Sequence, residues 1–461
     1  MDFKQVKPIL DTTKPQIFIE TYGCQMNVYD SEVLLSLLQD AGYSLCNEIE
    51  NADVIFVNTC SIRDNAEQRI NGRLDYFLQL KKKRAKLAVK MPLTVGILGC
   101  MAERLKDKLL EHPAVDIVAG PDSYREMPKL LENLRSGDKQ INTLLLPDET
   151  YADITPIRMD KNGVSAFISI MRGCNNMCSY CVVPYTRGKE RSRDPQSIIR
   201  EAKELYVNGY REVSLLGQNV DSYHWADPDN PTHTTNFAQL LEEVALISPK
   251  LRVRFSTSHP KDMSNGVLYT MAMYPNICNH IHLPVQSGSD VMLAKMNRKY
   301  TREWYMERIS KIREILPDCA ISTDIIAGFC GETEQDHKDT LSLMEEVGYD
   351  YAYMFQYSER PNTKAARHFK DDISLEVKTR RLNEIIELQG RLSLAANQKC
   401  LGKKYEVLIE GTSKRSSEQL NGRTPQNKMV VFDGKGHKVG DYVTVKINGC
   451  TSATLLGEIV E

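Results

Sequence analysis

The sequence is informative first through what it lacks. Its 461 residues contain no apolar run long enough to cross a membrane. The first residues, Met-Asp-Phe-Lys-Gln-Val-Lys-Pro, lack the charged-then-apolar plan of a secretory signal peptide. Basic and acidic residues nearly balance, with a formal net charge of -2, so the chain is not a bulk polycation. We therefore expect a cytoplasmic protein with no membrane partner, and any contact with nucleic acid must come from local basic patches.

Cysteine, in contrast, is frequent. Twelve cysteines in a cytosolic chain need a use other than disulfides, and metal binding is the natural one. Three of them lie in one short run, Cys174-Asn-Asn-Met-Cys178-Ser-Tyr-Cys181. Three thiolates on one loop can bind three irons of a 4Fe-4S cluster, and the fourth iron stays open to a small molecule. Ferredoxins and structural zinc sites use other spacings and a fourth ligand. The spacing is typical of the radical S-adenosylmethionine (SAM) enzymes.

A second cysteine set is spread over the N-terminal third, where predicted strands and helices alternate. The strands are expected at residues 16–20, 53–57 and 94–98. Such alternation predicts a parallel sheet, and the carboxyl ends of its strands lie at one edge. One cysteine follows each strand, and these are Cys24, Cys60 and Cys100. We predict that they converge as a second three-cysteine cluster site. The alternative is that they are ordinary buried cysteines.

The alternation resumes after a linker-like segment at about residues 136–163. Six further strands are predicted at residues 165–170, 212–216, 252–256, 279–285, 320–327 and 351–356. A parallel sheet closing part or all of a barrel would place the functional loops at one rim. Residues 226–236 are expected as a loop, and a long amphipathic helix at about residues 374–399 ends this region.

The last part of the chain reads as short strands, at residues 405–409, 428–432, 442–447 and 453–456, separated by glycine-containing turns. This pattern predicts a small all-β barrel. From Gln398 onwards ten Lys and Arg stand against seven Asp and Glu, and this basic excess favours RNA. The predicted fold class is α/β. Its domains are an open parallel α/β sheet at residues 14–135, a partial (β/α) barrel at 160–397 and the all-β barrel at 398–461.

Two groups of binding residues are predicted besides the cysteines. Loops at the carboxyl ends of the barrel strands, and a tyrosine beside the last cysteine, offer polar and aromatic groups to SAM: Tyr180, Gln218, Asn219, Gln286, Ser287, Asp324, Gly328 and Glu332. Basic residues past the cysteine loop and in the C-terminal region are candidates for RNA contact: Arg187, Lys189, Arg191, Arg193, Lys414, Arg415, Arg423 and Lys428. The simpler alternatives are ordinary turns for the first group and a solvated face for the second.

The whole chain resembles the methylthiotransferase branch of the radical SAM enzymes. The two cysteine sets carry this resemblance, together with Val182-Val-Pro-Tyr-Thr-Arg187-Gly, Leu215-Leu-Gly-Gln-Asn-Val220 and Leu283-Pro-Val-Gln-Ser-Gly288. The resemblance implies an N-terminal domain with an auxiliary 4Fe-4S cluster, a radical SAM barrel with a second 4Fe-4S cluster, and a C-terminal TRAM domain that binds RNA. The motifs are most similar to the members that act on dimethylallyladenosine in tRNA.

The resemblance also implies a reaction. One SAM would donate the methyl group, and a second, bound at the Cys174/Cys178/Cys181 cluster, would be cleaved to a radical that removes hydrogen from C2 of an adenine. The product would be a methylthio group at C2 of N(6)-dimethylallyladenosine beside the anticodon. The implied partners are a tRNA anticodon stem-loop, an electron donor of the flavodoxin or ferredoxin type, and a sulfur donor of unknown nature. The target base must leave its stack, which costs about a few kcal/mol.

Two alternatives stay open at this point. A sister methylthiotransferase, acting on threonylcarbamoyladenosine in tRNA or on an aspartate of a ribosomal protein, would have the same domains and clusters. A non-catalytic RNA-binding iron–sulfur protein would need four ligands for each cluster. The six other cysteines show no spacing that completes either set and are expected in cores or turns: Cys46, Cys278, Cys319, Cys330, Cys400 and Cys450.

Overall fold

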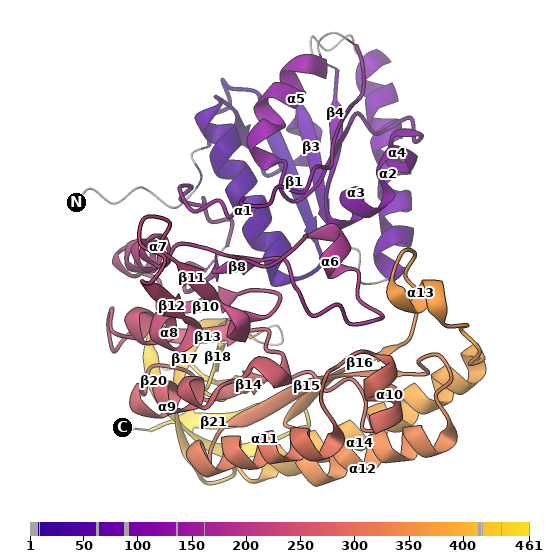
Figure 1. Ribbon diagram of the computed structural model, residues 1–461. Helices are drawn as coiled ribbons and strands as arrows, with labels where there is room; N and C mark the ends of the chain where they lie inside the picture. The colour runs from indigo at the N-terminus through magenta and orange to yellow at the C-terminus, as the bar shows by residue number, and fades with distance from the viewer. Residues whose placement is uncertain are drawn as a thin grey trace. The chain divides into compact units, whose positions relative to one another are not determined.

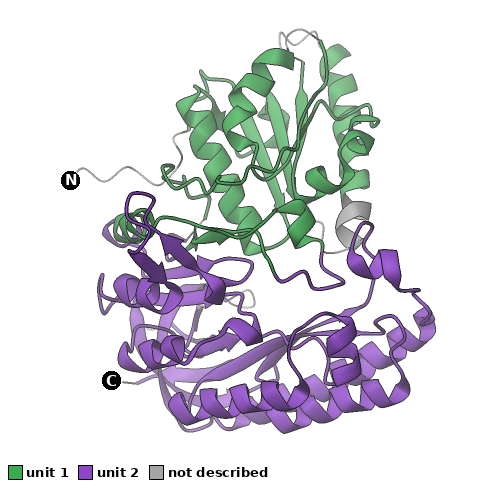
Figure 2. Ribbon diagram, viewed as in Figure 1, with its two compact units in different colours: residues 1–160, 167–175, 182–204 green, residues 161–166, 176–181, 205–461 purple. Residues whose placement is uncertain are grey.

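The computed structural model describes residues 8, 10–60, 64–86, 92–134, 137–160, 162–413, 416, 418–434 and 436–460, and of residues 64–69 only the backbone. The chain divides into two compact units, shown in Figure 2. Unit 1 comprises residues 1–160, 167–175 and 182–204. Unit 2 comprises residues 161–166, 176–181 and 205–461.

Unit 1 is built on a six-stranded parallel sheet with the strand order β2-β1-β3-β4-β5-β6 (Figure 1). The strands are β1 (Gln16–Tyr22), β2 (Ser44–Leu45), β3 (Val54–Thr59), β4 (Thr94–Gly99), β5 (Ile117–Ala119) and β6 (Gln140–Asn142). This confirms the predicted open parallel sheet. The strand β6 lies inside the segment expected as a linker, so the sheet continues further along the chain than predicted.

Both faces of this sheet are covered by helices, because its central strands carry apolar side chains on both faces. Successive side chains of a strand point to opposite faces. Val54 and Phe56 of β3 join one apolar cluster with α1 (Gln25–Asp40) and α5 (Met127–Asn133). Ile55 and Val57 join the other cluster with α2 (Asp64–Lys86) and α3 (Cys100–Leu105). The remaining elements of unit 1 include α4 (Asp107–Leu110), β8 (Met171–Arg172), α6 (Val183–Thr186), β9 (Arg191–Ser192) and the start of α7 (Pro195–Val207).

Unit 2 contains the second set of alternating strands and helices. Two three-stranded sheets have the orders β13-β10-β7 and β14-β15-β16, and an isolated parallel bridge joins Val253 to Ile277. The strands are β7 (Ser165–Ser169), whose residues 167–169 are assigned to unit 1, β10 (Glu212–Leu216), β13 (Arg252–Ser256), β14 (His280–His282), β15 (Ala320–Ala327) and β16 (Tyr351–Gln356). The bounds of β10, β13, β15 and β16 agree with the prediction, and β14 is shorter than expected.

Helices connect these strands, as the alternating pattern predicts. They are α8 (Phe237–Ala245), α9 (Asn265–Met273), α10 (Asp290–Lys295), α11 (Arg302–Ile315), α12 (Glu334–Val347), α13 (Lys364–His368) and α14 (Leu375–Gln398). The insertion expected at residues 226–236 is turn-rich, and two short antiparallel strands that the prediction lacks bound it, β11 (His224–Ala226) and β12 (Thr234–Asn236).

The C-terminal part of unit 2 is a closed five-stranded barrel with the order β17-β18-β19-β21-β20, which confirms the predicted all-β module. Its strands are β17 (Lys404–Thr412), β18 (Gln419–Arg423), β19 (Met429–Asp433), β20 (Tyr442–Cys450) and β21 (Leu455–Ile459). The prediction misses β18, since Asn421-Gly422 has the composition of a turn. Gly422 is needed there for close packing: a Cβ would lie 2.1 Å from the Leu408 carbonyl oxygen.

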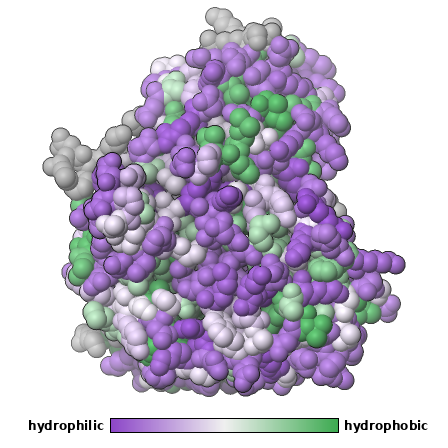
Figure 3. All heavy atoms as spheres, in the orientation of Figure 1, coloured by the Kyte–Doolittle hydropathy of each residue, from purple (hydrophilic) through white to green (hydrophobic). Residues whose placement is uncertain are grey.

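The face shown in Figure 3 carries mainly hydrophilic residues, with hydrophobic ones in small groups. Within the described part of the chain, no helix combines the length and apolar character that crossing a membrane requires. Four of the six cysteines outside the two proposed sets belong to apolar clusters, as expected: Cys46, Cys330, Cys400 and Cys450.

Candidate functional site

The structure brings Cys24, Cys60 and Cys100 to one edge of the parallel sheet of unit 1. The last residues of β1, β3 and β4 are neighbours in the ladder, because Tyr22 pairs with Thr59 and Thr59 pairs with Gly99. Cys60 and Cys100 directly follow β3 and β4, and Cys24 stands two residues after β1, at the start of α1. Parallel register and these short connections therefore make the three thiols neighbours.

Two glycines allow this approach. Gly23 has φ +130°, and a Cβ on it would lie 2.5 Å from the Cβ of Cys60. Gly99 has φ +83°, and a Cβ on it would lie 2.4 Å from Asn58 Oδ1. Any side chain at either position would collide with the neighbouring strand end. The Gly-Cys pairs in the sequence are thus required by the backbone of this edge.

Two buried asparagines, for which the sequence alone indicates no role, join the strand ends. Asn27 Nδ2 donates to Asn58 Oδ1 at 3.0 Å, and Asn58 Nδ2 donates to the Asn27 carbonyl oxygen at 2.9 Å. The Cys24 thiol donates to Asn27 Oδ1 at 3.2 Å. The signal that could have identified them is their position beside the cysteines, three residues after Cys24 and two before Cys60.

The electrostatic surroundings favour a thiolate in this group. A hydrogen bond from Cys60 lowers the pKa of Cys24 to about 6, with help from the positive charge of Arg187. Burial raises the pKa of Cys100, and Arg187 opposes that effect. Among the described residues no three His, Cys, Asp or Glu side chains are arranged to share one metal ion. In a cubane cluster, however, each thiolate binds a different iron, so the donor set and its charge suit a 4Fe-4S cluster.

The basic run after the second cysteine loop lies largely inside unit 1. Arg187 pairs with Asp30 at 2.7 Å, Arg191 pairs with Asp122 at 2.7 Å, and all these side chains are buried. Arg193 is also buried, and it pairs with Glu201. The three guanidinium groups proposed for RNA are therefore enclosed and engaged with carboxylates, which leaves them no phosphate-facing surface in unit 1. Lys189, the fourth member of the run, is exposed.

The loop with Cys174, Cys178 and Cys181 passes from unit 1 into unit 2 between residues 175 and 176. In unit 1 the Cys174 amide donates to the Gly188 carbonyl oxygen at 3.1 Å. In unit 2 the Cys181 amide donates to the Cys178 carbonyl oxygen at 3.0 Å, and Arg298 Nη1 donates to Cys178 Sγ at 3.3 Å. Three thiols within eight residues are the donor set that an open-iron cubane requires.

Tyr180, predicted to pack against the adenine of SAM, packs on an apolar cluster of unit 2. Its ring meets Phe329 edge-on with the centroids 6.5 Å apart. Its hydroxyl oxygen accepts a hydrogen bond from Arg298 Nη1 at 3.3 Å. The same guanidinium group thus contacts the ring's hydroxyl and Cys178.

Polar residues predicted for SAM follow strands of the barrel, and three of them are already engaged with other side chains of unit 2. Asn219 Nδ2 donates to Asp262 Oδ2 at 2.7 Å. Ser287 is buried against Thr340, and Asp324 lies 3.4 Å from His282. The remaining two are Gln218, whose buried Oε1 has no hydrogen-bond partner among the described residues, and Gln286, whose backbone φ is +76°.

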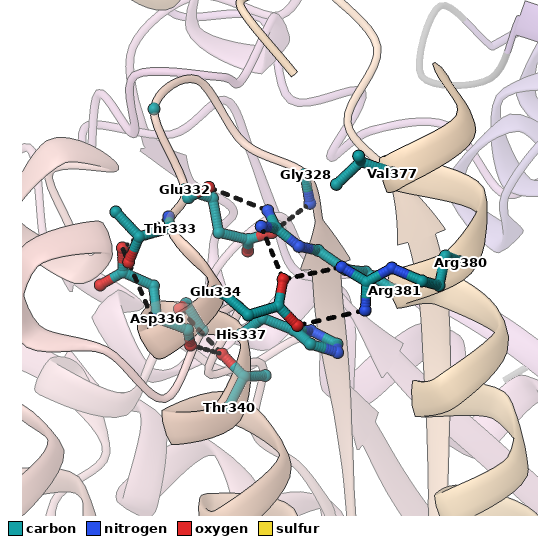
Figure 4. A network of polar contacts seen from close by, with 12 residues as sticks. Gly328, Glu332, Thr333, Glu334, Asp336, His337, Thr340, Val377, Arg380 and Arg381 are labelled. Carbon is teal, nitrogen blue, oxygen red and sulfur yellow. Dashed lines mark hydrogen bonds and ion pairs between the residues drawn. The ribbon is translucent and has the colours of Figure 1, made fainter. Parts of the chain in front are cut away.

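The turn after β15, drawn in Figure 4, is held by the Glu332 carboxylate. Its Oε2 accepts from the Gly328 amide at 2.7 Å and from Arg381 Nη1 at 2.9 Å. Gly328 has φ +73°, and a Cβ there would lie 2.3 Å from the Cγ of Lys378. Glu332 is buried, and its carboxylate fixes the turn from within.

In the C-terminal barrel, two of the predicted RNA contacts also have protein partners. Lys428 Nζ lies 2.7 Å from Asp350 Oδ1, and Arg423 Nε lies 3.4 Å from Glu410 Oε2. Lys414 and Arg415 lie outside the described residues.

Comparison with known proteins matches three families to this chain. The Radical SAM superfamily matches residues 168–344, an uncharacterized family designated UPF0004 matches residues 16–120, and the TRAM domain matches residues 398–460. Among solved structures, the radical S-adenosylmethionine methyltransferase TsrM from Kitasatospora setae is similar in fold, with a TM-score of 0.56 at 13% identity, over 76% of this chain and 75% of TsrM.

Relatives with much higher identity are named tRNA-2-methylthio-N(6)-dimethylallyladenosine synthase. The one from Bacteroides thetaiotaomicron is 57% identical, over 96% of this chain and 96% of the relative. The one from Phocaeicola vulgatus is 55% identical, over 100% of this chain and 98% of the relative. The chain therefore belongs to the radical SAM family of tRNA-2-methylthio-N(6)-dimethylallyladenosine synthases.

Proposed function

We propose that this protein attaches a methylthio group to C2 of N(6)-dimethylallyladenosine next to the anticodon of tRNA. It uses SAM both as the methyl donor and as the source of a radical. The observation that carries this proposal is the pair of three-cysteine sets, one at a sheet edge and one on a short loop, in a chain so similar to the named synthases. Such an enzyme would work where tRNA is found, so the proposed location is the cytoplasm.

Each cysteine set would hold one 4Fe-4S cluster. Cys174, Cys178 and Cys181 would hold the cluster that binds SAM, and Cys24, Cys60 and Cys100 the auxiliary one. When bound, the clusters and SAM supply the one-electron and group-transfer chemistry. The protein supplies thiolate ligands, orients the cofactors and excludes water. Electrons would come from a donor of the flavodoxin or ferredoxin type.

The SAM pocket would be shaped by the barrel loops, with two kinds of contribution. Residues with groups still available are the proposed direct contacts, and Gln218 is the clearest because its buried oxygen needs a donor. Glu332 instead contributes by fixing the turn whose Gly328 backbone can approach the adenine. The further proposed contacts are Gln286 and four residues that would exchange their present partners for SAM: Tyr180, Asn219, Ser287 and Asp324.

The tRNA would be bound mainly by the TRAM barrel and by exposed basic residues near the cysteine loop. Lys189 is exposed in unit 1, and Lys414 and Arg415 belong to the basic C-terminal segment. Arg423 and Lys428, which contact carboxylates, would have a smaller share. Arg187, Arg191 and Arg193 would act from inside unit 1, on the fold and not on RNA.

The experiment is an anaerobic assay with SAM, a reductant and tRNA that carries dimethylallyladenosine. In the C24A/C60A/C100A protein we expect 5′-deoxyadenosine but no methylthio product, because only the radical cluster would remain. In the C174A/C178A/C181A protein we expect neither. The control is C46A, whose thiol lies outside both sets and should leave product formation unchanged. Methylthio product from either triple variant would refute the proposal.

A further inference from the structure

Arg187 is buried, and its guanidinium group donates a hydrogen bond to Cys100, one of the proposed cluster ligands. Its Nε donates to Cys100 Sγ at 3.3 Å, and its Nη2 donates to Asp30 Oδ2 at 2.7 Å. Its Nη1 is buried and has no hydrogen-bond partner among the described residues, and the same holds for the hydroxyl group of neighbouring Tyr124. Buried donors normally have acceptors, so the unsatisfied Nη1 of a guanidinium group that contacts Cys100 indicates a missing acceptor.

The charges of this region do not balance. Asp30 pairs with Arg172 at 2.8 Å as well as with Arg187, and Asp122 pairs with Arg191 at 2.7 Å and with Arg172 at 3.5 Å. Three buried guanidinium groups thus share two buried carboxylates, which leaves one positive charge for the thiolates beside Arg187 to balance. Burying a charge without a partner is strongly unfavourable.

A second buried network in unit 1 provides the comparison. There Arg158 pairs with Glu32 and Glu201, and Arg193 pairs with Glu201. Two guanidinium groups meet two carboxylates, so that network is neutral, and it contains no cysteine. The excess charge is therefore confined to the network that contacts the cysteine set, where a thiolate-bound iron–sulfur cluster would supply negative charge and sulfur acceptors.

We propose that Arg187 is a positioning residue for the auxiliary cluster. Arg187 contacts the cluster through its ligand Cys100 and raises the midpoint potential of the cluster. Hydrogen bonds to cluster sulfurs and nearby positive charge both favour the reduced, more negative state. This inference rests on the proposed function, because it assumes that Cys24, Cys60 and Cys100 hold a cluster. The role needs the whole guanidinium group, because Nη2 orients it by a hydrogen bond to Asp30 while Nε donates to the sulfur of Cys100.

The test uses the full-length chain with C174A/C178A/C181A, so that only the auxiliary cluster remains, and a redox titration followed by electron paramagnetic resonance. With and without the added R187M substitution we expect about four irons for each chain. The midpoint potential should be more negative in R187M. R187M leaves two guanidinium groups on two carboxylates, so the substitution removes the excess positive charge and leaves no buried carboxylate unpaired. R187K keeps the positive charge but lacks the several N–H donors of a guanidinium group. Its midpoint potential should also be more negative, by less than in R187M.

The matched control is R191M in the same background. It removes one charge from the same network but no group that contacts a sulfur, so its shift should be less than half that of R187M. An unchanged potential in R187M, or equal shifts in R187M and R191M, would overturn the inference. If R187M fails to retain iron, an unchanged potential in R187K would overturn it instead. Absence of iron from the background protein itself would refute the auxiliary cluster, and this inference with it.

Discussion

Arginine has different roles in this chain, and the surroundings of each guanidinium group decide which. Arg381 is buried and holds the Glu332 carboxylate at 2.9 Å, while its neighbour Arg380 is exposed and pairs with Glu334 at 2.7 Å. Removing a buried partner leaves a charge without compensation, whereas an exposed pair loses little. Two adjacent arginines of one helix thus contribute differently to the stability of unit 2.

We predict that R381M lowers the stability of unit 2 by about 3–5 kcal/mol, because Glu332 would remain buried and unpaired. The matched variant R380M should change it far less, because its ion pair is exposed to solvent. Urea denaturation followed by tryptophan fluorescence measures this for unit 2, since both tryptophans of the chain, Trp225 and Trp304, lie there. Equal losses in the two variants would contradict the assignment of Glu332 to the turn.

At the scale of the element, the edge where β1, β3 and β4 end brings together the three cysteines of the proposed auxiliary site. Gly99 has φ +83° and ψ -155°, a region that is essentially restricted to glycine. A Cβ there would also lie 2.8 Å from the Thr59 carbonyl oxygen. The geometry of this edge therefore depends on a residue that carries no chemistry of its own.

We predict that G99A destabilises unit 1 by about 2–4 kcal/mol, from backbone strain and from the clash with Asn58 and Thr59. Gly72 provides the control, because it lies in α2 and a methyl group on it would have nothing within 4 Å. G72A should be stabilising by about 0.5–1 kcal/mol. Hydrogen exchange of the β3 and β4 amides measures the stability change in both variants. If G99A leaves the stability unchanged, Gly99 does not approach Asn58 and Thr59 as closely as described.

The sequence predicts helices and strands well where the spacing of apolar residues fits only one kind of element. The strands β10, β13, β15 and β16 are apolar runs between clear turns, and their bounds are confirmed. The strand β18 was not predictable, because only the approach of another backbone explains why Asn421-Gly422 is extended. The enclosure of Arg187 and Arg191 was hidden for a related reason: their partners Asp30 and Asp122 are distant in sequence, and composition does not distinguish an exposed arginine from a buried one.

At the scale of the whole molecule, the C-terminal barrel is joined to the rest of unit 2 by buried arginines. Arg252 Nη1 donates to the Arg423 carbonyl oxygen at 2.7 Å, and Arg254 Nη2 donates to the Thr424 carbonyl oxygen at 2.8 Å. Deleting the barrel would strip these groups of their acceptors and destabilise unit 2. Point substitutions are therefore the better test of RNA binding.

We predict that K414E/R415E weakens binding of the tRNA and reduces the slope of log affinity against log salt by about 0.7–0.9 for each phosphate that the protein no longer neutralises. The control K311E changes a lysine of α11 that pairs with Glu314, outside the basic C-terminal segment, and should bind tRNA normally. Filter binding at several salt concentrations measures both. A salt slope that does not change would exclude these residues from the RNA surface.

The central claim is that two clusters are each held by three cysteines of this chain. Iron and acid-labile sulfide, counted after anaerobic reconstitution, test it most directly. We predict about eight of each for the unchanged protein and about four for C24A/C60A/C100A and for C174A/C178A/C181A. Added SAM should perturb the electron paramagnetic resonance signal only where Cys174, Cys178 and Cys181 are present. A triple variant that keeps eight irons, or protein that binds zinc in place of iron, would contradict the account.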